Sequence, residues 1–211
     1  KPVTTVFTIG LEETHQAMAA KAAAADDSPI LKIKLGDHLP YELLAAIRAA
    51  RPDAKLVVDA NQSWSFELLQ QVLPKCVDLD LEMIEQPLAR GRDEMLEGFE
   101  SPITLAADES CLHTGELETA AQRYDMINIK LDNTGGLTES LKLARAANEI
   151  GCQLMVGNMV GTSLSMAPSF VVAQLCDFVD IDGPLLLKYD QPPAMVYDKG
   201  VVSAPTPALW G

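Results

Sequence analysis

The sequence predicts a (β/α)7β barrel, in which parallel strands are joined by helices. Short β-like segments alternate with longer helical ones along the whole chain, and this alternation is typical of parallel strands with crossover helices. Nearly every predicted strand ends in ionisable residues. Barrel enzymes carry their active sites at these carboxyl ends of the strands. No glycine-rich phosphate-binding loop follows a predicted strand, and this counts against the rival fold, an open doubly wound sheet.

The predicted strands are short runs of apolar and β-branched residues. The second one, LKIKLG, places two lysines on one face, because side chains two residues apart on a strand share a face. In chain order the predicted strands are Thr4–Ile9, Leu31–Leu35, Lys55–Asp59, Leu81–Glu85, Ile103–Asp108, Met126–Leu131, Gln153–Asn158 and Phe178–Asp182.

The predicted helices fill the intervals between these strands. The helix at Leu137–Ile150 has apolar residues at helical spacing, and Gly151 follows it as a C-cap. No clear helix follows the last strand, so the pattern has seven helices rather than eight. The others are Leu11–Ala25, Tyr41–Ala50, Phe66–Leu73, Asp93–Phe99, Gly115–Gln122 and Ser163–Leu175.

The C-terminal segment differs from the rest because four prolines interrupt regular structure from Lys188 onward. We therefore expect a barrel domain over residues 1–187 and a tail over residues 188–211. This tail would pack on the barrel or on a capping domain.

The composition limits the possible partners. The chain has 211 residues and a formal net charge of −14, which argues against nucleic acid and anionic membrane surfaces as partners. It has no apolar run of transmembrane length. Its four cysteines form no CxxC pair, which favours reduced thiols in a cytoplasmic protein over disulfides or zinc.

Three carboxylates stand at the ends of three consecutive predicted strands: Asp59, Glu85 and Asp108. Carboxylates that are brought together repel one another, and their ionised forms need a cation. Oxygen ligands suit a hard ion such as Mg²⁺. The alternative is that each one is a helix cap or a surface charge. Their common position in three successive strands favours the metal site.

Lysines occupy the strands on either side of these carboxylates, Lys34 before them and Lys130 after them. A lysine amine acts as a base when neighbouring cations or burial favour its neutral form, and Lys32 would supply one such cation. Lys130 has two alternatives, a salt bridge to Asp132 or Asp180 and a Schiff-base role. The carboxylate cluster counts against the Schiff base, because imine chemistry needs no metal.

Together these groups fit one reaction class. Removal of a proton α to a carboxylate creates concentrated negative charge, which a divalent metal stabilises while a lysine takes the proton. A second lysine on the opposite face of the substrate would return the proton from that side. The pattern therefore predicts a racemase or epimerase.

The motifs LKIKLG, VVDANQSW, EMIEQPL, LAADES and INIKLDNTGGLTES resemble the barrel domain of the enolase superfamily, in its muconate-lactonizing-enzyme subgroup. The resemblance implies that one Mg²⁺ is bound by Asp59, Glu85 and Asp108. It also implies that Lys34 and Lys130 are the acid/base catalysts. Lys32 would contact the substrate carboxylate and assist Lys34.

The segment DIDGPLLL, with Asp180 and Asp182, resembles the DxD motif of dipeptide epimerases such as L-Ala-D/L-Glu epimerase. That resemblance implies that the two carboxylates bind the free ammonium group of a dipeptide substrate. The alternatives are an ion pair with Lys32 or solvated charges at a strand end. The motif leans against an N-acylamino acid substrate, which has no ammonium group there.

The resemblance implies an N-terminal α+β capping domain before the barrel. We expect that the present sequence is a fragment without this domain, or that the domain belongs to a part not shown. We expect the isolated chain to bind Mg²⁺ and to show little turnover, because an open site admits water. The same residues leave four other functions open: an N-acylamino acid racemase, a cycloisomerase, an o-succinylbenzoate synthase and an inactive barrel fragment that only binds metal. The expected partner is a small-molecule substrate, a dipeptide or an N-acylamino acid, and a homo-oligomer is possible.

Overall fold

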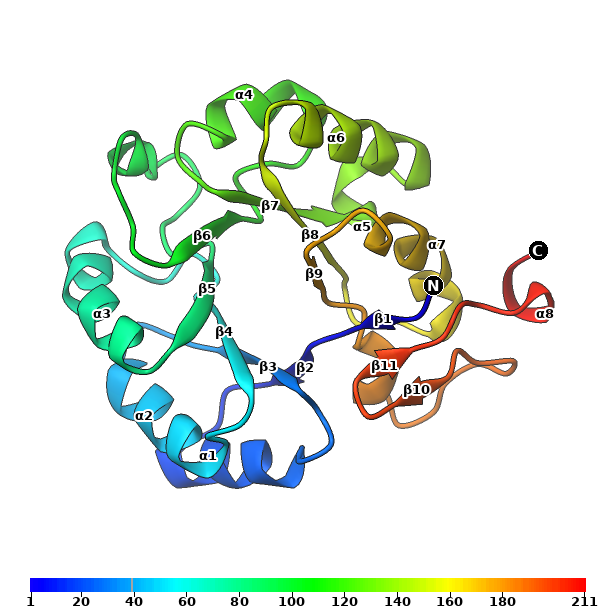
Figure 1. Cartoon of the computed structure of the whole chain (residues 1–211), viewed down its shortest axis with the longest axis horizontal. Coiled ribbons are helices and arrows are strands. Elements are labelled where there is room, and N and C mark those ends of the chain that lie inside the picture. Colours follow the sequence, from blue (N-terminus) through cyan, green and yellow to red (C-terminus); the bar gives the residue numbers. More distant parts are fainter. Residues whose placement is uncertain (39) are drawn as a thin grey trace. The chain divides into compact units, whose positions relative to one another are not determined.

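The protein is described by a computed structural model that covers residues 1–38 and 40–211. These residues form two compact units. The N-terminal unit comprises Phe7–Ser110 and Gln122–Asp125, and the C-terminal unit comprises Lys1–Val6, Cys111–Ala121 and Met126–Gly211. Figure 1 shows the elements of both units in sequence colours.

Eight strands of the described chain, β2 to β9, follow one another in chain order, as a (β/α) repeat requires. Neighbouring strands are parallel within each unit. The N-terminal unit contains β2 (Phe7–Ile9), β3 (Ile30–Lys34), β4 (Lys55–Asp59), β5 (Leu81–Glu85) and β6 (Thr104–Ala107), and the C-terminal unit contains β7 (Met126–Lys130), β8 (Gln153–Gly157) and β9 (Phe178–Val179).

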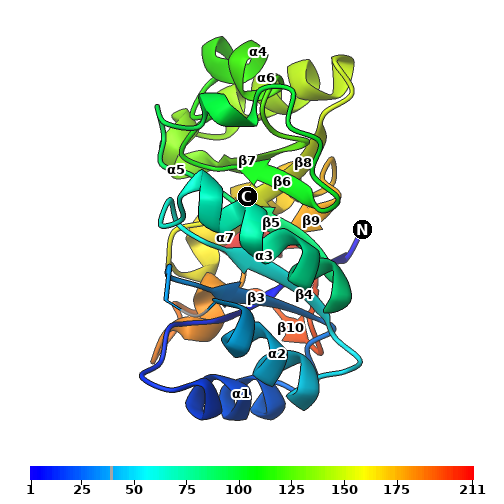
Figure 2. The ribbon, with the colours of Figure 1, turned by 90° about the vertical axis from the view of Figure 1, so that its left-hand side faces the viewer.

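The helices of the N-terminal unit cover one side of its strands. Helix α2 packs against both α1 and α3, and Figure 2 shows the three helices beside β3 and β4. The inner face of α2 buries Leu44 and Ile47 completely. The elements are α1 (His15–Ala24), α2 (Pro40–Ala50), α3 (Phe66–Asp78) and a single 3₁₀ turn, η1 (Glu94–Leu96).

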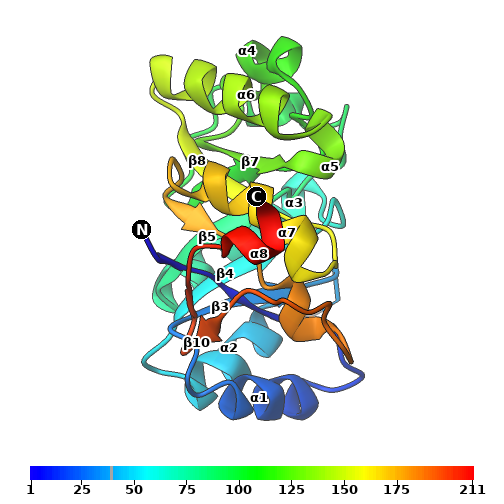
Figure 3. The ribbon, with the colours of Figure 1, turned by 90° about the vertical axis from the view of Figure 1, so that its right-hand side faces the viewer.

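The described helices of the C-terminal unit are short, except for α6 and α7. Figure 3 shows α7 beside α6, and the last helix, α8, packs against α7. The elements are η2 (Thr114–Glu116), α4 (Leu117–Ala120), α5 (Leu131–Thr134), α6 (Leu137–Glu149), α7 (Ser163–Ala173), η3 (Gly183–Leu186) and α8 (Pro207–Trp210). No helix among the described residues is both long enough and apolar enough to cross a membrane.

Local capping explains where the long helices begin. The Ser65 side chain accepts a hydrogen bond from the Leu68 backbone N–H at 3.1 Å, which satisfies one of the free donors at the start of α3. Helix α3 then continues to Asp78, so the prediction that it ends at Leu73 is wrong. Pro74 lies inside the helix instead of terminating it.

Two predicted strands differ from the structure by more than one residue at an end. The predicted strand Thr4–Ile9 is two strands, because β1 (Val3–Thr4) pairs antiparallel with β11 (Val201–Val202), whereas β2 starts at Phe7. The predicted strand Phe178–Asp182 ends at Val179, since the next residues bond differently. In particular, the Ile181 N–H donates to the Thr5 hydroxyl.

Residues 188–211 are part of the C-terminal unit. Strand β10 (Tyr197–Asp198) pairs with β11, and β11 pairs with β1. Asp190 accepts hydrogen bonds from the backbone N–H and the hydroxyl of Ser163 at the start of α7. The predicted domain boundary at residue 187 remains a prediction.

Candidate active site

The strand register of the N-terminal unit aligns three of the predicted site residues. Lys34 lies opposite Asp59, and Asp59 lies opposite Glu85, on β3, β4 and β5. Lys32 is two residues before Lys34 and shares its face. The opposite face of β3 carries Leu31 and Ile33, which are fully buried. The strands therefore direct apolar residues to one side and ionisable ones to the other.

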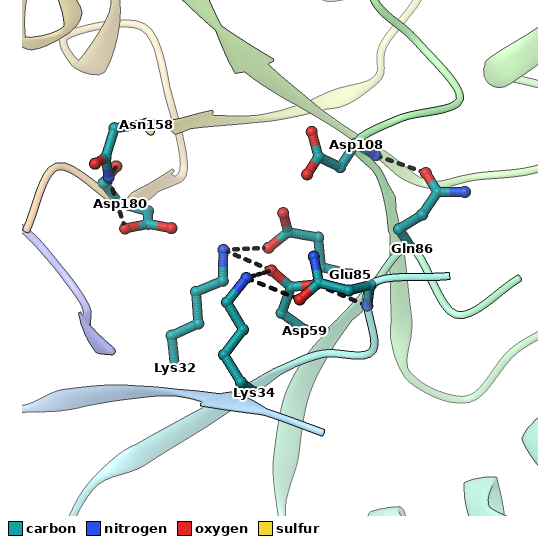
Figure 4. A network of polar contacts seen from close by, with 9 residues as sticks. Lys32, Lys34, Asp59, Glu85, Gln86, Asp108, Asn158 and Asp180 are labelled. Atoms are coloured by element: carbon teal, nitrogen blue, oxygen red, sulfur yellow. Dashed lines mark hydrogen bonds and ion pairs between the residues drawn. The ribbon is translucent and has the colours of Figure 1, made fainter. Parts of the chain in front are cut away.

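The two lysines bind the two carboxylates directly (Figure 4). Lys32 Nζ lies 3.1 Å from Asp59 Oδ2 and 2.7 Å from Glu85 Oε2. Lys34 Nζ lies 2.6 Å from the same Asp59 oxygen and donates to Asn61 Oδ1 at 2.9 Å. The other Asp59 oxygen, Oδ1, accepts from the Asn61 backbone N–H at 3.0 Å. Asp59 is thus held at both of its oxygens.

Burial makes these ion pairs significant. Lys32 is 2% exposed, and Asp59 and Glu85 are both 0% exposed. A buried charge is strongly unfavourable unless it is paired and hydrogen-bonded. Two lysines on one face of a core strand are accommodated because their ammonium groups meet carboxylates from the next two strands.

Asp108 follows β6 in the same unit and is 2% exposed. Its backbone N–H donates to the side-chain oxygen of Gln86 at 2.9 Å. Gln86 directly follows Glu85, so one buried amide joins the ends of two strands that carry predicted metal ligands (Figure 4).

The predicted metal ligands match a hard cation in donor chemistry. Asp59, Glu85 and Asp108 are buried carboxylates at the ends of β4, β5 and β6. As they stand, no three His, Cys, Asp or Glu side chains among residues 1–38 and 40–211 converge closely enough to hold a metal ion. Instead, Asp59 and Glu85 contact the ammonium groups of the two lysines.

Lys130 ends β7 in the C-terminal unit and is buried. Asn128 precedes it by two residues and shares its face. The neighbouring strand leaves room for both side chains through Gly157, which lies opposite Lys130. A Cβ atom at Gly157 would lie 2.9 Å from Lys130 Cε and 2.6 Å from Asn128 Oδ1. Only glycine fits there without displacing a neighbour.

Asp180 and Asp182 follow β9 and are both buried. The Asn158 amide donates to the Asp180 carboxylate at 3.1 Å and to the Asp180 carbonyl at 2.6 Å (Figure 4). Tyr197 lies near Asp182. Burial raises the pKa of the Tyr197 phenol, and the negative charge of Asp182 acts in the same direction.

Three amide residues near the predicted site residues have no role in the sequence prediction: Asn61, Gln86 and Asn158. Each is an amide within two residues of the end of a strand, in the segments DAN, EQP and GN. An amide close to a strand end was the available signal. The partner of each amide depends on the folded structure.

A family model for "Enolase C-terminal domain-like" matches residues 15–208. The chain belongs to this family. The described residues of this enolase C-terminal domain-like chain include eight parallel strands in chain order with helices between them, so the predicted fold class, a (β/α)7β barrel, is confirmed.

Known proteins similar to this enolase-family chain are racemases and epimerases. The N-acetyl-D-glutamate racemase of Pseudoalteromonas sp. is 41% identical over 199 residues, covering 94% of this chain and 63% of that protein. The L-Ala-D/L-Glu epimerase of Escherichia coli K12 is 44% identical over 171 residues, covering 81% of this chain and 53% of that protein.

A solved structure that is similar to this chain is also described as related to epimerases. It is an enolase family member from Agrobacterium tumefaciens with homology to dipeptide epimerases, bound to sodium and L-Ala-L-Glu. This structure is 44% identical, has a TM-score of 0.94, and is matched over 100% of this chain and 64% of its own length. The enolase-family chain thus spans between about half and two thirds of the length of these relatives.

Proposed function

We propose that the complete protein is a Mg²⁺-dependent dipeptide epimerase similar to L-Ala-D/L-Glu epimerase. It would invert one α-carbon by moving a single proton through an enolate. The observation that carries the proposal is the buried cluster of Lys32, Lys34, Asp59 and Glu85, in which a potential base lies next to potential metal ligands. The named relatives support the reaction class.

One Mg²⁺ would be held by Asp59, Glu85 and Asp108. Their burial and their oxygen donors support this assignment, and two solved dipeptide epimerases similar to this chain are described as complexes with Mg and a dipeptide. When bound, the metal supplies positive charge that stabilises the enolate oxygens. The carboxylates would have to draw together from their present contacts with the lysines.

Lys34 and Lys130 would exchange the α-proton. Lys34 is the partly exposed lysine of the cluster, and its Nζ is held by Asp59 and Asn61. The more buried Lys32 would contribute fixed positive charge for the substrate carboxylate. Lys130 would take or return the proton on the other face of the substrate, from a position that Gly157 keeps open.

Asp180 and Asp182 would bind the free ammonium group of the dipeptide. Two buried carboxylates are a favourable site for a cation, and Asn158 orients one of them. The similar structure from Agrobacterium tumefaciens is described with bound L-Ala-L-Glu, which carries such an ammonium group.

The test is solvent-deuterium exchange at the α-carbon of L-Ala-L-Glu in D₂O with added Mg²⁺. Lys34→Ala and Lys130→Ala should each lower epimerisation by about 10²- to 10⁴-fold, the usual contribution of an acid/base group. Lys142→Ala, at an exposed lysine of α6 paired with Glu139, is the matched control and should stay near wild type. Normal epimerisation in both Lys34 and Lys130 variants would disprove the mechanism.

The second candidate is an N-acylamino acid racemase, because one of the most similar relatives is an N-acetyl-D-glutamate racemase. The two substrates differ in the ammonium group. Asp180→Asn should therefore reduce kcat/KM for the dipeptide much more than for N-acetyl-glutamate. Faster turnover of N-acetyl-glutamate than of L-Ala-L-Glu by the wild-type protein would favour the racemase. An unsaturated product would instead indicate an eliminating synthase.

The proposal includes a cytoplasmic location. None of the four cysteines forms a disulfide in the part of the chain that the structure describes, which fits a reducing compartment. Burial raises the pKa of Cys76 to about 12, so this thiol stays protonated and unreactive.

A further inference from the structure

Gln86 is a buried polar residue to which the proposed chemistry gives no role. Its exposed fraction is 0%, and it lies between Glu85, a proposed metal ligand, and Pro87. Its backbone has a positive φ of 38°, a conformation that non-glycine residues seldom adopt. Such a conformation persists only where surrounding contacts hold it.

The side-chain amide of Gln86 uses both of its ends. Its oxygen accepts from the backbone N–H of Asp108 at 2.9 Å and from that of Ser110 at 3.1 Å. Its nitrogen lies 2.9 Å from the Leu88 carbonyl, 2.8 Å from the Ser110 hydroxyl and 2.9 Å from the Tyr124 hydroxyl. All of these residues belong to the N-terminal unit.

A second buried side chain fixes the orientation of this amide. Asp93, which is 1% exposed, accepts from the Ser110 hydroxyl at 2.5 Å and from the Tyr124 hydroxyl at 2.8 Å. Both hydroxyl protons are therefore directed to Asp93. The two protons of the Gln86 nitrogen are shared among the two hydroxyl oxygens and the Leu88 carbonyl. The charge of Asp93 is balanced by Arg123 at 2.9 Å.

This network connects the ends of β5 and β6. Glu85 is covalently adjacent to Gln86, and the backbone of Asp108 is hydrogen-bonded to it. The Gln86 backbone N–H also donates to the carbonyl of Ala106 on β6, at 2.8 Å. Besides the pairing of β5 with β6, the Gln86 amide thus holds the two proposed ligands in place, and Asp93, Ser110 and Tyr124 hold that amide.

We propose that Gln86 is a positioning residue that sets the spacing of Glu85 and Asp108 and thereby the affinity of the site for Mg²⁺. The inference rests on the proposed function, because it assumes that these carboxylates bind the metal. Residues that hydrogen-bond to metal ligands orient them and so change metal affinity, although they do not contact the metal.

The test is calorimetric titration of the full-length protein with Mg²⁺, comparing wild type with Gln86→Met. The variant keeps the length of the side chain and removes all of its hydrogen bonds. We expect its Mg²⁺ affinity to fall by about 10- to 100-fold, the usual effect of losing such a support. Most of kcat should return at saturating Mg²⁺. Gln174→Met, which removes an amide bound to Lys1 and Phe170 in the C-terminal unit, is the control and should bind Mg²⁺ normally.

Two further variants separate a positioning role from a merely structural one. Tyr124→Phe removes one hydroxyl that holds the Gln86 amide, and it should weaken Mg²⁺ binding several-fold. Combined with Gln86→Met it should add little, because both changes act through the same contact. If Gln86→Met does not fold, Tyr124→Phe and Ser110→Ala provide the test.

The outcomes distinguish the inference from the function. A stable Gln86→Met variant with wild-type Mg²⁺ affinity would overturn the inference and leave the proposed function intact. Wild-type Mg²⁺ affinity in both Tyr124→Phe and Ser110→Ala would also overturn it. A wild-type protein that binds no Mg²⁺ would overturn both the inference and the function.

Discussion

Replacement of Gly157 by alanine tests whether the position of Lys130 matters to the reaction. The added Cβ would lie 2.9 Å from Lys130 Cε, and 2.6 Å and 2.8 Å from the two amide atoms of Asn128. Carbon atoms prefer separations of about 3.5 Å or more, so Lys130 Cε would retreat by roughly 0.6 Å. Because Lys130 is buried, the displaced side chain has little free space.

The displacement sets the size of the expected effect. A misplacement of about 1 Å at a reacting group can reduce the rate by about 10²-fold, so we expect kcat to fall by about 10- to 100-fold. Overpacking of a core position also destabilises by about 1–3 kcal/mol, which denaturant unfolding would measure.

The assay follows α-proton exchange in D₂O separately from each epimer of L-Ala-Glu at its glutamate α-carbon. Gly157→Ala should slow exchange from the epimer that Lys130 deprotonates and largely preserve exchange from the epimer that Lys34 deprotonates. The control is Gly10→Ala, since an added Cβ there meets no atom within 4 Å. An equal loss from both epimers, or no loss in a folded variant, would refute the reasoning.

Three other substitutions have defined outcomes. Lys32→Met removes the ammonium group that pairs with the buried Asp59 and Glu85 carboxylates. The free energy of unfolding in denaturant should fall by about 3–5 kcal/mol, and added Mg²⁺ should restore part of it. Unchanged stability would contradict this prediction. Ser65→Ala should lower the unfolding free energy by about 1 kcal/mol through loss of the α3 cap; a Thr replacement should restore it. Burial opposes ionisation of Asp190, but hydrogen bonds dominate and lower its pKa below the ordinary 3.8. The stabilising effect of the ionised Asp190 carboxylate is therefore complete above pH 3.8. It is lost as the pH falls through the lower pKa of this group in the folded protein. Asp190→Asn should destabilise at pH 7 but little in strong acid, and an equal effect at both pH values would argue against the carboxylate.

Periodic features of the fold could be predicted from the sequence. Strands Lys55–Asp59 and Leu81–Glu85 have the predicted bounds, because short segments rich in apolar residues that end at a polar residue are typical of buried strands. The predictions failed where backbone bonding depends on distant partners. β1 separates from β2 because its partner, β11, lies near the other end of the chain.

The ionisable residues at the strand ends can be identified from the amino-acid sequence alone. A lysine pair at spacing two and acidic residues at the ends of successive strands follow from local pattern and the (β/α) repeat. For this reason Lys32, Lys34, Asp59 and Glu85 could be named in advance. The structure brings them into contact, and their roles stay predictions.

The partner of each side chain depends on how the strands are assembled. The two lysines share the Asp59 carboxylate, and Gln86 supports Asp108 through contacts with residues up to 38 positions away along the chain. Hydrogen bonds form within about 3 Å and depend on direction, whereas sequence periodicity specifies only the face of an element. That difference in range is why the amides Asn61, Gln86 and Asn158 acquire a role only when the strands are assembled.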